Sequence, residues 1–522
     1  MAPTSAASAR ARRGSVLPLR PLTAAVTLGA IGTMAVTTAR DPDLFWHLRT
    51  GQWIWAHQAI PRSDPFSWTA PGRKWIAHEW LTEVTYASLH STFGWAGIAA
   101  ISALVIVTGW MLVRATCLHL GAGPVAASAA TVLAAVSSLH TWGTRPQMVS
   151  LMFTALFAWL ILHARTGTNN RLWAAPAAML LWANLHGGYI LGIAMLWAFT
   201  ASVVVELILA KTRFGQAILD TRTVTPATGR LLRTSILATA ASTAVTLVNP
   251  NGLDGFTYPF SYLGKNASTK YVLEWFAPNF ARVQYWPFAI MAALAALTVV
   301  KHRKSLPAHT LAIGLPFAYL AFQSVRNITQ FAIVSAPVVA LLISRKTAKA
   351  RAATPGSVST REVGFGRTTG GVGADERKAA AIVYGMIGVA MIVASAPTLT
   401  ASANERVHKR EFPVAATKEL VRLNASGTVR VFNQYDWGGY LTYAAPGVKV
   451  FVDGRPDMYG DRFIDRYMST WWLKVGWQNR LTQDGVNTVI ANPASKMVIE
   501  LSKDPTWRKV YMDSVAVILQ RV

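Results

Sequence analysis

The feature that most constrains this chain is a series of long apolar segments that recurs between residues 22 and 397. Hydrophobic residues make up 52% of the 522 residues, charged residues only 14%, and the mean hydropathy is +0.31. Apolar segments of nearly twenty residues can cross the hydrocarbon core of a bilayer as α-helices. We therefore predict an α-helical polytopic membrane protein with about eleven transmembrane helices. The segments lie near residues 22–38, 95–113, 122–138, 147–163, 172–184, 190–210, 234–248, 286–300, 309–323, 329–344 and 379–397.

Basic residues gather in alternate loops, and this pattern predicts the orientation. If residues 1–20 are a basic cytoplasmic N-terminus, the segments on that side carry 23 Lys and Arg against 4 acidic residues, and the opposite loops carry 10 against 7. Positive charge favours the cytoplasmic side. This distribution accounts for the net charge of +26 without a nucleic-acid surface. We expect a multi-pass protein of the cell inner (plasma) membrane, although residues 1–39 also fit a cleaved signal peptide.

Three regions stand apart from the apolar segments of the transmembrane domain, 21–397. A large first outer loop spans 39–94, and its Trp and Pro content predicts helices that lie on the membrane surface. Residues 345–378 are rich in Gly, Ser and Thr, which predicts a disordered cytoplasmic linker. Residues 398–522 alternate predicted strands ("TVRVFN", "VKVFVD", "VNTVIA") with predicted helices ("GGYLTYA", "DRFIDRYMSTWWLKV", "ASKMVIELSKD") and end in a hairpin. We expect this last region to be an extracytoplasmic α/β domain.

Ionisable and amide side chains recur in the loops on the predicted outer side. The first outer loop begins with "RDPDLFWHL" and ends with "HEW", and later loops contain "HTWGTRPQ", "WANLHGGY" and "SVRNITQ". Polar groups at membrane depth are costly unless they face a cavity and act there. Carboxylates can serve as a base, and Arg and His can neutralise a phosphate. The set suits a lipid-linked phosphate substrate, whereas each loop taken alone could simply solvate the helix ends.

These motifs, in this order, resemble the GT-C superfamily of polytopic glycosyltransferases, which use polyprenyl-phosphate-linked sugars. In that family an acidic motif follows the first span, juxtamembrane helices come next, and a soluble outer domain often ends the chain. Here "RDPDLFWHL", residues 50–90 and residues 398–522 take those places. The motifs "WANLHGG" and "YDWGGYL…VFVDGRPDMYG" resemble an uncharacterised bacterial branch. The resemblance implies transfer of a sugar from a polyprenyl-phosphate donor to an envelope glycan, lipid or protein acceptor on the outer face.

The resemblance also implies roles for individual side chains. Asp41 becomes the general base, Asp43 its partner and Glu79 a second acid near the cavity. Two simpler interpretations stay open: Asp41 caps a helix, and Asp43 pairs with Arg49.

The remaining candidate residues divide into two sets, for the donor phosphate and for the acceptor. The donor phosphate would be neutralised by Arg145, His186 and Arg326. The acceptor or other substrate groups would be bound by His47, Asn184, Asp453, Arg455 and Asp457. For the acidic and basic residues of "VDGRPD", internal ion pairs are the alternative.

The sequence predicts no obligatory cofactor, although Asp41, Asp43 and His47 could bind a divalent cation. Cys117 is the only cysteine, which excludes an intrachain disulfide. No "GxxxxGK" occurs, which disfavours a nucleotide-sugar enzyme. A transporter or flippase of lipid-linked sugars is the main alternative, but it should place its polar residues near the membrane midplane. A non-catalytic envelope-assembly protein would not need Asp41 or Arg145.

Overall fold

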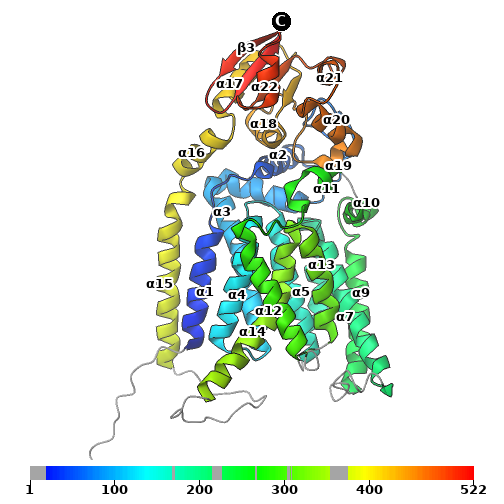
Figure 1. Ribbon diagram of the computed structural model, residues 1–522, viewed down its shortest axis with the longest axis vertical. Helices are drawn as coiled ribbons and strands as arrows, with labels where there is room; N and C mark the ends of the chain where they lie inside the picture. Colours follow the sequence, from blue (N-terminus) through cyan, green and yellow to red (C-terminus); the bar gives the residue numbers. More distant parts are fainter. Residues whose placement is uncertain are drawn as a thin grey trace, which may run out of the picture.

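The computed structural model describes residues 19–166, 171–213, 226–264, 267–302, 306, 308–352 and 374–522. A bundle of long helices forms one end of the molecule, and a smaller module of helices and strands forms the other (Figure 1). Each of the eleven predicted apolar segments coincides with a helix of the bundle. These are α1 (Leu19–Ala35), α3 (Trp80–His119), α4 (Pro124–Ser138), α5 (Gln147–Thr166), α6 (Ala175–Leu185), α7 (Tyr189–Leu209), α9 (Pro226–Val245), α12 (Trp286–His302), α13 (Ala308–Gln323), α14 (Ile328–Ala352) and α15 (Ala374–Leu399).

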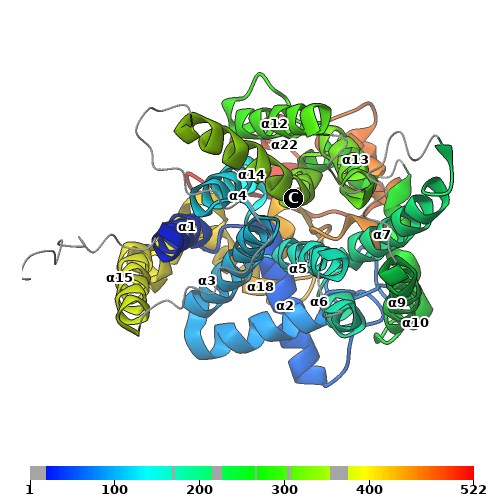
Figure 2. The same cartoon turned by 90° about the horizontal axis from the view of Figure 1, so that it is seen from below.

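Seven segments among the described residues are long and apolar enough to cross a membrane. They lie in α3, α4, α5, α7, α12, α14 and α15, whereas α1, α6, α9 and α13 are shorter or less apolar. Seen from below, these four helices stand within the same bundle (Figure 2). The chain is a multi-pass membrane protein, and the count of eleven spans stays a prediction.

The predicted first outer loop contains two helices that cross the end of the bundle. They are α2 (Pro42–His57) and the first arm of α3, which bends at Gly94, where φ is 59°. Glycine adopts positive φ at little steric cost, so the interfacial arm and the membrane-crossing arm of α3 can take different directions. Helix α2 begins earlier than the sequence predicted, at the acidic motif itself.

The C-terminal module, residues 401–522, contains a four-stranded mixed sheet in the order β1-β2-β4-β3. Strand β1 is parallel to β2, and β4 is antiparallel to both β2 and β3. The predicted terminal hairpin is present as β3 and β4. The strands are β1 (Val431–Asn433), β2 (Thr488–Ala491), β3 (Trp507–Met512) and β4 (Val517–Arg521), and the helices are α16 (Ala401–Glu411), α17 (Val414–Leu423), α18 (Gly438–Ala444), α19 (Pro456–Tyr459), α20 (Asp461–Trp471), α21 (Trp477–Gln483) and α22 (Lys496–Leu501).

One predicted strand of this module is wrong. The segment "VKVFVD" does not join the sheet, because its backbone pairs with the first outer loop instead. The amide of Val450 donates to the Phe66 carbonyl at 3.1 Å, and the amide of Trp68 donates to the Val450 carbonyl at 3.1 Å. This pairing fastens the module to the loop.

The predicted linker 345–378 is shortened from both sides. Helix α14 continues through Ala352 and α15 begins at Ala374, so 353–373 lie outside the described residues. The same holds for most of the predicted cytoplasmic segment 1–20.

Helix α2 lies between the bundle and the C-terminal module (Figure 1). Phe45 on α2 packs in one apolar cluster with Phe412, Trp437 and Tyr440 of the module. Trp46, the next residue, belongs to the second apolar cluster of the module. Burial of these aromatic side chains on both sides of α2 fixes the helix that carries the acidic motif.

Candidate active site

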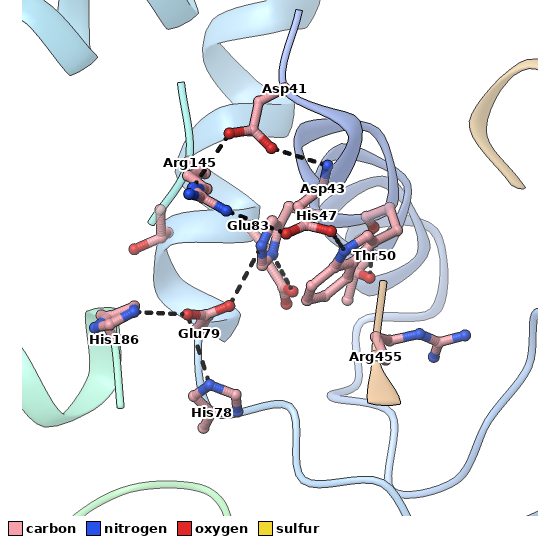
Figure 3. Close-up of polar contacts among 12 residues, drawn as sticks. Asp41, Asp43, His47, Thr50, His78, Glu79, Glu83, Arg145, His186 and Arg455 are labelled. Carbon is pink, nitrogen blue, oxygen red and sulfur yellow. Dashed lines mark hydrogen bonds and ion pairs between the residues drawn. The ribbon is translucent and has the colours of Figure 1, made fainter. Parts of the chain in front are cut away.

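The candidate residues predicted near the membrane gather at the end of the bundle that faces the module. Asp41 precedes α2, Glu79 precedes α3, Arg145 precedes α5, His186 follows α6, and Arg326 lies in a short helix, η8 (Val325–Asn327). The side chains of the first four belong to two neighbouring polar clusters, one around Arg145 and one around Glu79 (Figure 3).

In the first cluster, the Arg145 guanidinium lies among three carboxylates. Its Nε is 3.2 Å from Asp41 Oδ2, and its other nitrogens contact Asp43 Oδ2 at 3.4 Å and Glu274 Oε1. Glu274 comes from the short helix η5 (Leu273–Trp275). The Arg145 side chain is 16% exposed, so its ion pairs are only partly screened by solvent. Arg145 therefore orients these acids.

Asp41 and Asp43 occupy different environments in this cluster. Asp41 caps α2, since its Oδ1 accepts a hydrogen bond from the Asp43 amide at 3.0 Å. Asp43 is 34% exposed and accepts a hydrogen bond from Trp46 Nε1 at 3.2 Å. Burial, together with the negative charge of Asp41, raises the pKa of Asp43 to about 6. Asp43 does not pair with Arg49, whose guanidinium lies over the Phe66 ring.

The second cluster is centred on Glu79. The Nε2 atoms of His186 and His78 lie 3.2 Å and 3.5 Å from Glu79 Oε1, and His47 Nε2 lies 3.4 Å from Glu79 Oε2. The other nitrogen of His47, Nδ1, lies 3.1 Å from Glu83 Oε1. Burial raises the pKa of Glu79, but the adjacent His78 and His47 outweigh burial and lower it below its usual range. Glu79 is therefore ionised.

The hydrogen bonds of the imidazoles assign their protonation. His186 Nδ1 accepts a hydrogen bond from the Gly188 amide at 2.9 Å, so the proton of the neutral ring is on Nε2 and faces Glu79. Burial lowers the pKa of His186 to about 3, so the ring stays neutral. His78 Nδ1 lies 3.1 Å from the Ile76 carbonyl. Burial lowers the pKa of His78, but Glu79 raises it to about 9, which makes this ring a cation at neutral pH.

Arg326 stands beside the first cluster. Its guanidinium lies 5.1 Å from the ring centroid of Trp275, the residue that follows Glu274. Ser324, two residues before it, donates a hydrogen bond to the Glu274 carbonyl at 2.8 Å. Within the described part of the chain, Arg326 forms no ion pair with a carboxylate, in contrast to Arg145. Its charge is therefore the more available to an incoming anion.

Three predicted substrate-binding residues are engaged in packing. The Asn184 amide bonds with Trp80 Nε1 and with the carbonyls of Leu180 and Val248. Asp453 and Arg455 are 0% and 1% exposed and pair with each other, as the alternative interpretation of "VDGRPD" expected. Arg455 also pairs with Asp64 of the first outer loop at 2.9 Å.

Asp457, in contrast, is exposed and accepts a hydrogen bond from Tyr258 at 3.0 Å. The Tyr258 ring stacks on His78 at 4.1 Å. Asp457 therefore extends the Glu79 cluster toward the C-terminal module.

Two glycines bring backbone close to the acidic motif. A Cβ atom at Gly143 would lie 2.9 Å from Asp41 Oδ2, and one at Gly454 would overlap Asp43 Oδ1. The "VDGRP" loop of the C-terminal module therefore lies directly against Asp43.

Sequence reasoning missed Glu274 and left Glu83 without a role. Glu274 is an isolated acid whose partner, Arg145, is far away in sequence. Glu83 follows Glu79 at helical spacing, four residues later, and this spacing places both on one face of α3. That signal could have found it.

Solved structures with a similar fold were found by comparison. The archaeal oligosaccharyltransferase AglB from Archaeoglobus fulgidus, in complex with an inhibitory peptide and a dolichol-phosphate, aligns with a TM-score of 0.55 at 12% identity, over 90% of this chain and 69% of that chain. Its apo form aligns over the same shares at 12% identity with a TM-score of 0.56. ArnT from Cupriavidus metallidurans, bound to undecaprenyl phosphate, aligns at 12% identity over 96% and 97% of the two chains, with a TM-score of 0.49. Neither a family model nor a curated protein matches the sequence. The chain shares the fold of AglB, which is the GT-C fold that its sequence motifs predicted.

Proposed function

We propose that this protein is a membrane glycosyltransferase that transfers a sugar from a polyprenyl-phosphate donor to an acceptor of the cell envelope. The observation that carries the proposal is the Asp41, Asp43, Glu274 and Arg145 cluster, which several elements build at one end of a GT-C fold, beneath the C-terminal module. The loops at this end carry fewer basic residues than the opposite loops. This difference supports an outer-face site.

The proposed reaction is a displacement at the anomeric carbon. An acceptor hydroxyl forms the new C–O bond while the bond from that carbon to the phosphate oxygen breaks. The hydroxyl proton passes to a carboxylate, and polyprenyl phosphate leaves with the electron pair. The protein therefore needs a base, a cation near the leaving group and a place for the lipid.

Asp43 is the better base of the acidic pair. Both acids have both oxygens engaged, but Asp41 also holds the helix cap and lies nearer to Arg145, at 3.2 Å against 3.4 Å for Asp43. Asp43 is more exposed, and its pKa of about 6 suits proton transfer near neutral pH. The proposal thus moves the base from Asp41, which the sequence favoured, to Asp43, and gives Asp41 the task of holding Arg145 and the first turn of α2.

Arg326 is the proposed partner of the donor phosphate. It lies next to the acidic cluster, stacks on Trp275, and has no carboxylate partner among the described residues. Arg145, which the sequence also favoured, is already surrounded by three acids. His186 is neutral and points its proton at Glu79, so we propose that it positions Glu79 instead.

A cavity beside the site supports a lipid-linked donor. Its volume is about 140 Å³, and it lies between α3 and α5, one helical turn from Glu79. Its lining is almost entirely apolar and includes Tyr86, Val105 and Met152. An apolar cavity of this volume has room for a short stretch of hydrocarbon chain. AglB, which has the same fold, was solved with a dolichol-phosphate.

The test is transfer of radiolabelled sugar from a panel of polyprenyl-phosphate sugars to cell-envelope extract by the purified protein. We expect transfer by the wild type and a loss of at least about 100-fold in Asp43→Asn. Glu500→Gln, which removes an exposed carboxylate of the module paired with Lys503, should keep the wild-type rate. If folded protein transfers no sugar but moves labelled lipid across vesicles, the protein is a flippase.

A further inference from the structure

His47, Glu79 and Glu83 form a compact set of buried ligand-type groups outside the proposed transfer chemistry. One nitrogen or oxygen atom from each residue lies within 4.8 Å of the corresponding atoms of the other two. The three residues are 3%, 7% and 1% exposed. They come from α2 and from the start of α3, and Figure 3 shows them facing one another.

One atom of this set lacks a partner. Glu83 Oε2 is buried and accepts no hydrogen bond from any residue that the structure describes, whereas Oε1 of the same carboxylate faces His47. A buried carboxylate oxygen without a donor or cation is costly. The remaining atoms of the set are paired. The unpartnered oxygen therefore marks a place where a cation would be bound favourably.

The contacts of His47 also favour a bound cation. Its two ring nitrogens each face a carboxylate, so the ring could donate to both only as an imidazolium. Even that form would leave Glu83 Oε2 without a partner. A divalent cation would bind one ring nitrogen of His47 together with the two acids, and would give Glu83 Oε2 a partner.

We propose that His47, Glu79 and Glu83 bind a divalent transition metal ion and that Zn²⁺ suits the site best. One imidazole and two carboxylates are ligands that zinc accepts, and a three-residue set leaves a fourth position open. Ligand atoms at zinc distances in a tetrahedron lie about 3.3–3.5 Å apart. The two acids face different nitrogens of the His47 ring, Nε2 at 3.4 Å and Nδ1 at 3.1 Å, so only one of these contacts can belong to the coordination of a single ion. One ligand atom from each of the three residues nevertheless lies within 4.8 Å of the other two. Calcium would need six to eight oxygen ligands, about twice what this set supplies.

The neighbouring imidazoles prepare Glu79 for this role. His186 and His78 both contact Glu79 Oε1, so Oε2 is left on the side of His47. His186 is in turn oriented by the Gly188 amide and by Ser150. Such outer partners fix the direction of a metal ligand.

The ion would join α2 to α3. His47 lies one helical turn after Asp43 on α2, so the ion would also fix the helix that carries the proposed base.

The experiment measures zinc bound to the full chain in detergent. Wild-type protein is stripped with a chelator, equilibrated with micromolar Zn²⁺, passed through a desalting column and analysed for metal by mass spectrometry. We expect about one zinc ion per chain and a rise in unfolding temperature with added Zn²⁺. Glu83→Gln and His47→Ala should each bind at least about tenfold more weakly. Two variants are used so that the failure of one to fold leaves the other informative.

Glu274→Gln is the matched control, because it neutralises a carboxylate of the neighbouring Arg145 cluster and leaves all three ligands in place. It should bind zinc as the wild type does. A wild type that stays free of zinc and shows no thermal shift would overturn the proposal. Zinc lost in Glu274→Gln but kept in Glu83→Gln would place the ion elsewhere and also overturn it. None of these readouts depends on glycosyl transfer.

Discussion

Replacement of Arg455 by Met should release the C-terminal module from the first outer loop. The guanidinium is 1% exposed and pairs with Asp64 and Asp453, which are both fully buried. It also lies 4.5 Å from the centroid of the Trp75 ring and 5.1 Å from that of Phe66. Methionine keeps much of the apolar stem of arginine but leaves two buried carboxylates without their cation. Breaking a buried pair in this way costs about 3–5 kcal/mol.

The assay is hydrogen exchange of full-length protein in detergent, followed by mass spectrometry of peptides from residues 61–76 and 448–455. A loss of about 3–5 kcal/mol should raise the opening equilibrium of these segments by roughly 100-fold to 4,000-fold. Peptides from the β3–β4 hairpin, which does not contact Arg455, should change little. The Tm of the whole protein should also fall.

A compensated variant separates charge from shape. In Asp64→Asn, Asp453→Asn, Arg455→Met, no buried charge is left unpaired, so exchange in these segments should return most of the way to the wild-type rate. If Arg455→Met alone raises exchange less than about fivefold, a cost under 1 kcal/mol, the three residues do not hold the module and the reasoning is refuted.

Three further predictions concern the candidate site. Sugar transfer should fall about tenfold per pH unit below pH 6 and level off above pH 7, because the proposed base Asp43 has a pKa of about 6 and must be ionised. Asp41→Asn removes a charge that raises this pKa, so the acidic side of the pH–rate profile should move to lower pH. Initial rates that stay flat from about pH 5 to 7 would count against Asp43. Gly454→Ala should lower kcat by about tenfold to 100-fold with little change in Tm, since its Cβ would displace Asp43. Gly447→Ala should keep the wild-type rate, because the space around a Cβ at Gly447 is open. Gly51→Ala should destabilise the protein by about 1–3 kcal/mol in thermal unfolding, because its Cβ would collide with the Glu83 carbonyl and separate α2 from α3. Gly314→Ala serves as its control, because a Cβ at Gly314 has no neighbouring atom within 4 Å. Equal Tm values for the two variants would contradict the close contact of α2 with α3.

The membrane part of the fold could be predicted because its signals are local. Each apolar segment carries its own length and composition, and each became a helix. The strand at 431–433 and the terminal hairpin were predictable for the same reason. The segment "VKVFVD" was not, because its alternation is that of a strand but its backbone partners lie near residue 67. A contact across more than 300 residues leaves no trace in a local pattern.

In the candidate site, too, the features with a local sequence signal could be predicted and those that depend on contacts between distant residues could not. The acidic motif was found from its position after the first apolar segment, and its helix cap was foreseen as an alternative. The Arg145 cluster depends on Glu274, which stands alone in its loop, and only the packing of the bundle brings the two together. Glu79 and Glu83, in contrast, share a helical spacing that sequence could have used.

Helix α2 explains why the two polar clusters belong together. Asp43 and His47 are one turn apart on it and point into different clusters, toward Arg145 and toward Glu79. Two further residues of the helix, Phe45 and Trp46, pack in the apolar clusters of the C-terminal module. A shift of the module must therefore move both Asp43 and His47. The module can then act on the proposed chemistry through the position of α2. Gly454→Ala perturbs Asp43 directly, whereas Arg455→Met perturbs the contact of the module with the first outer loop.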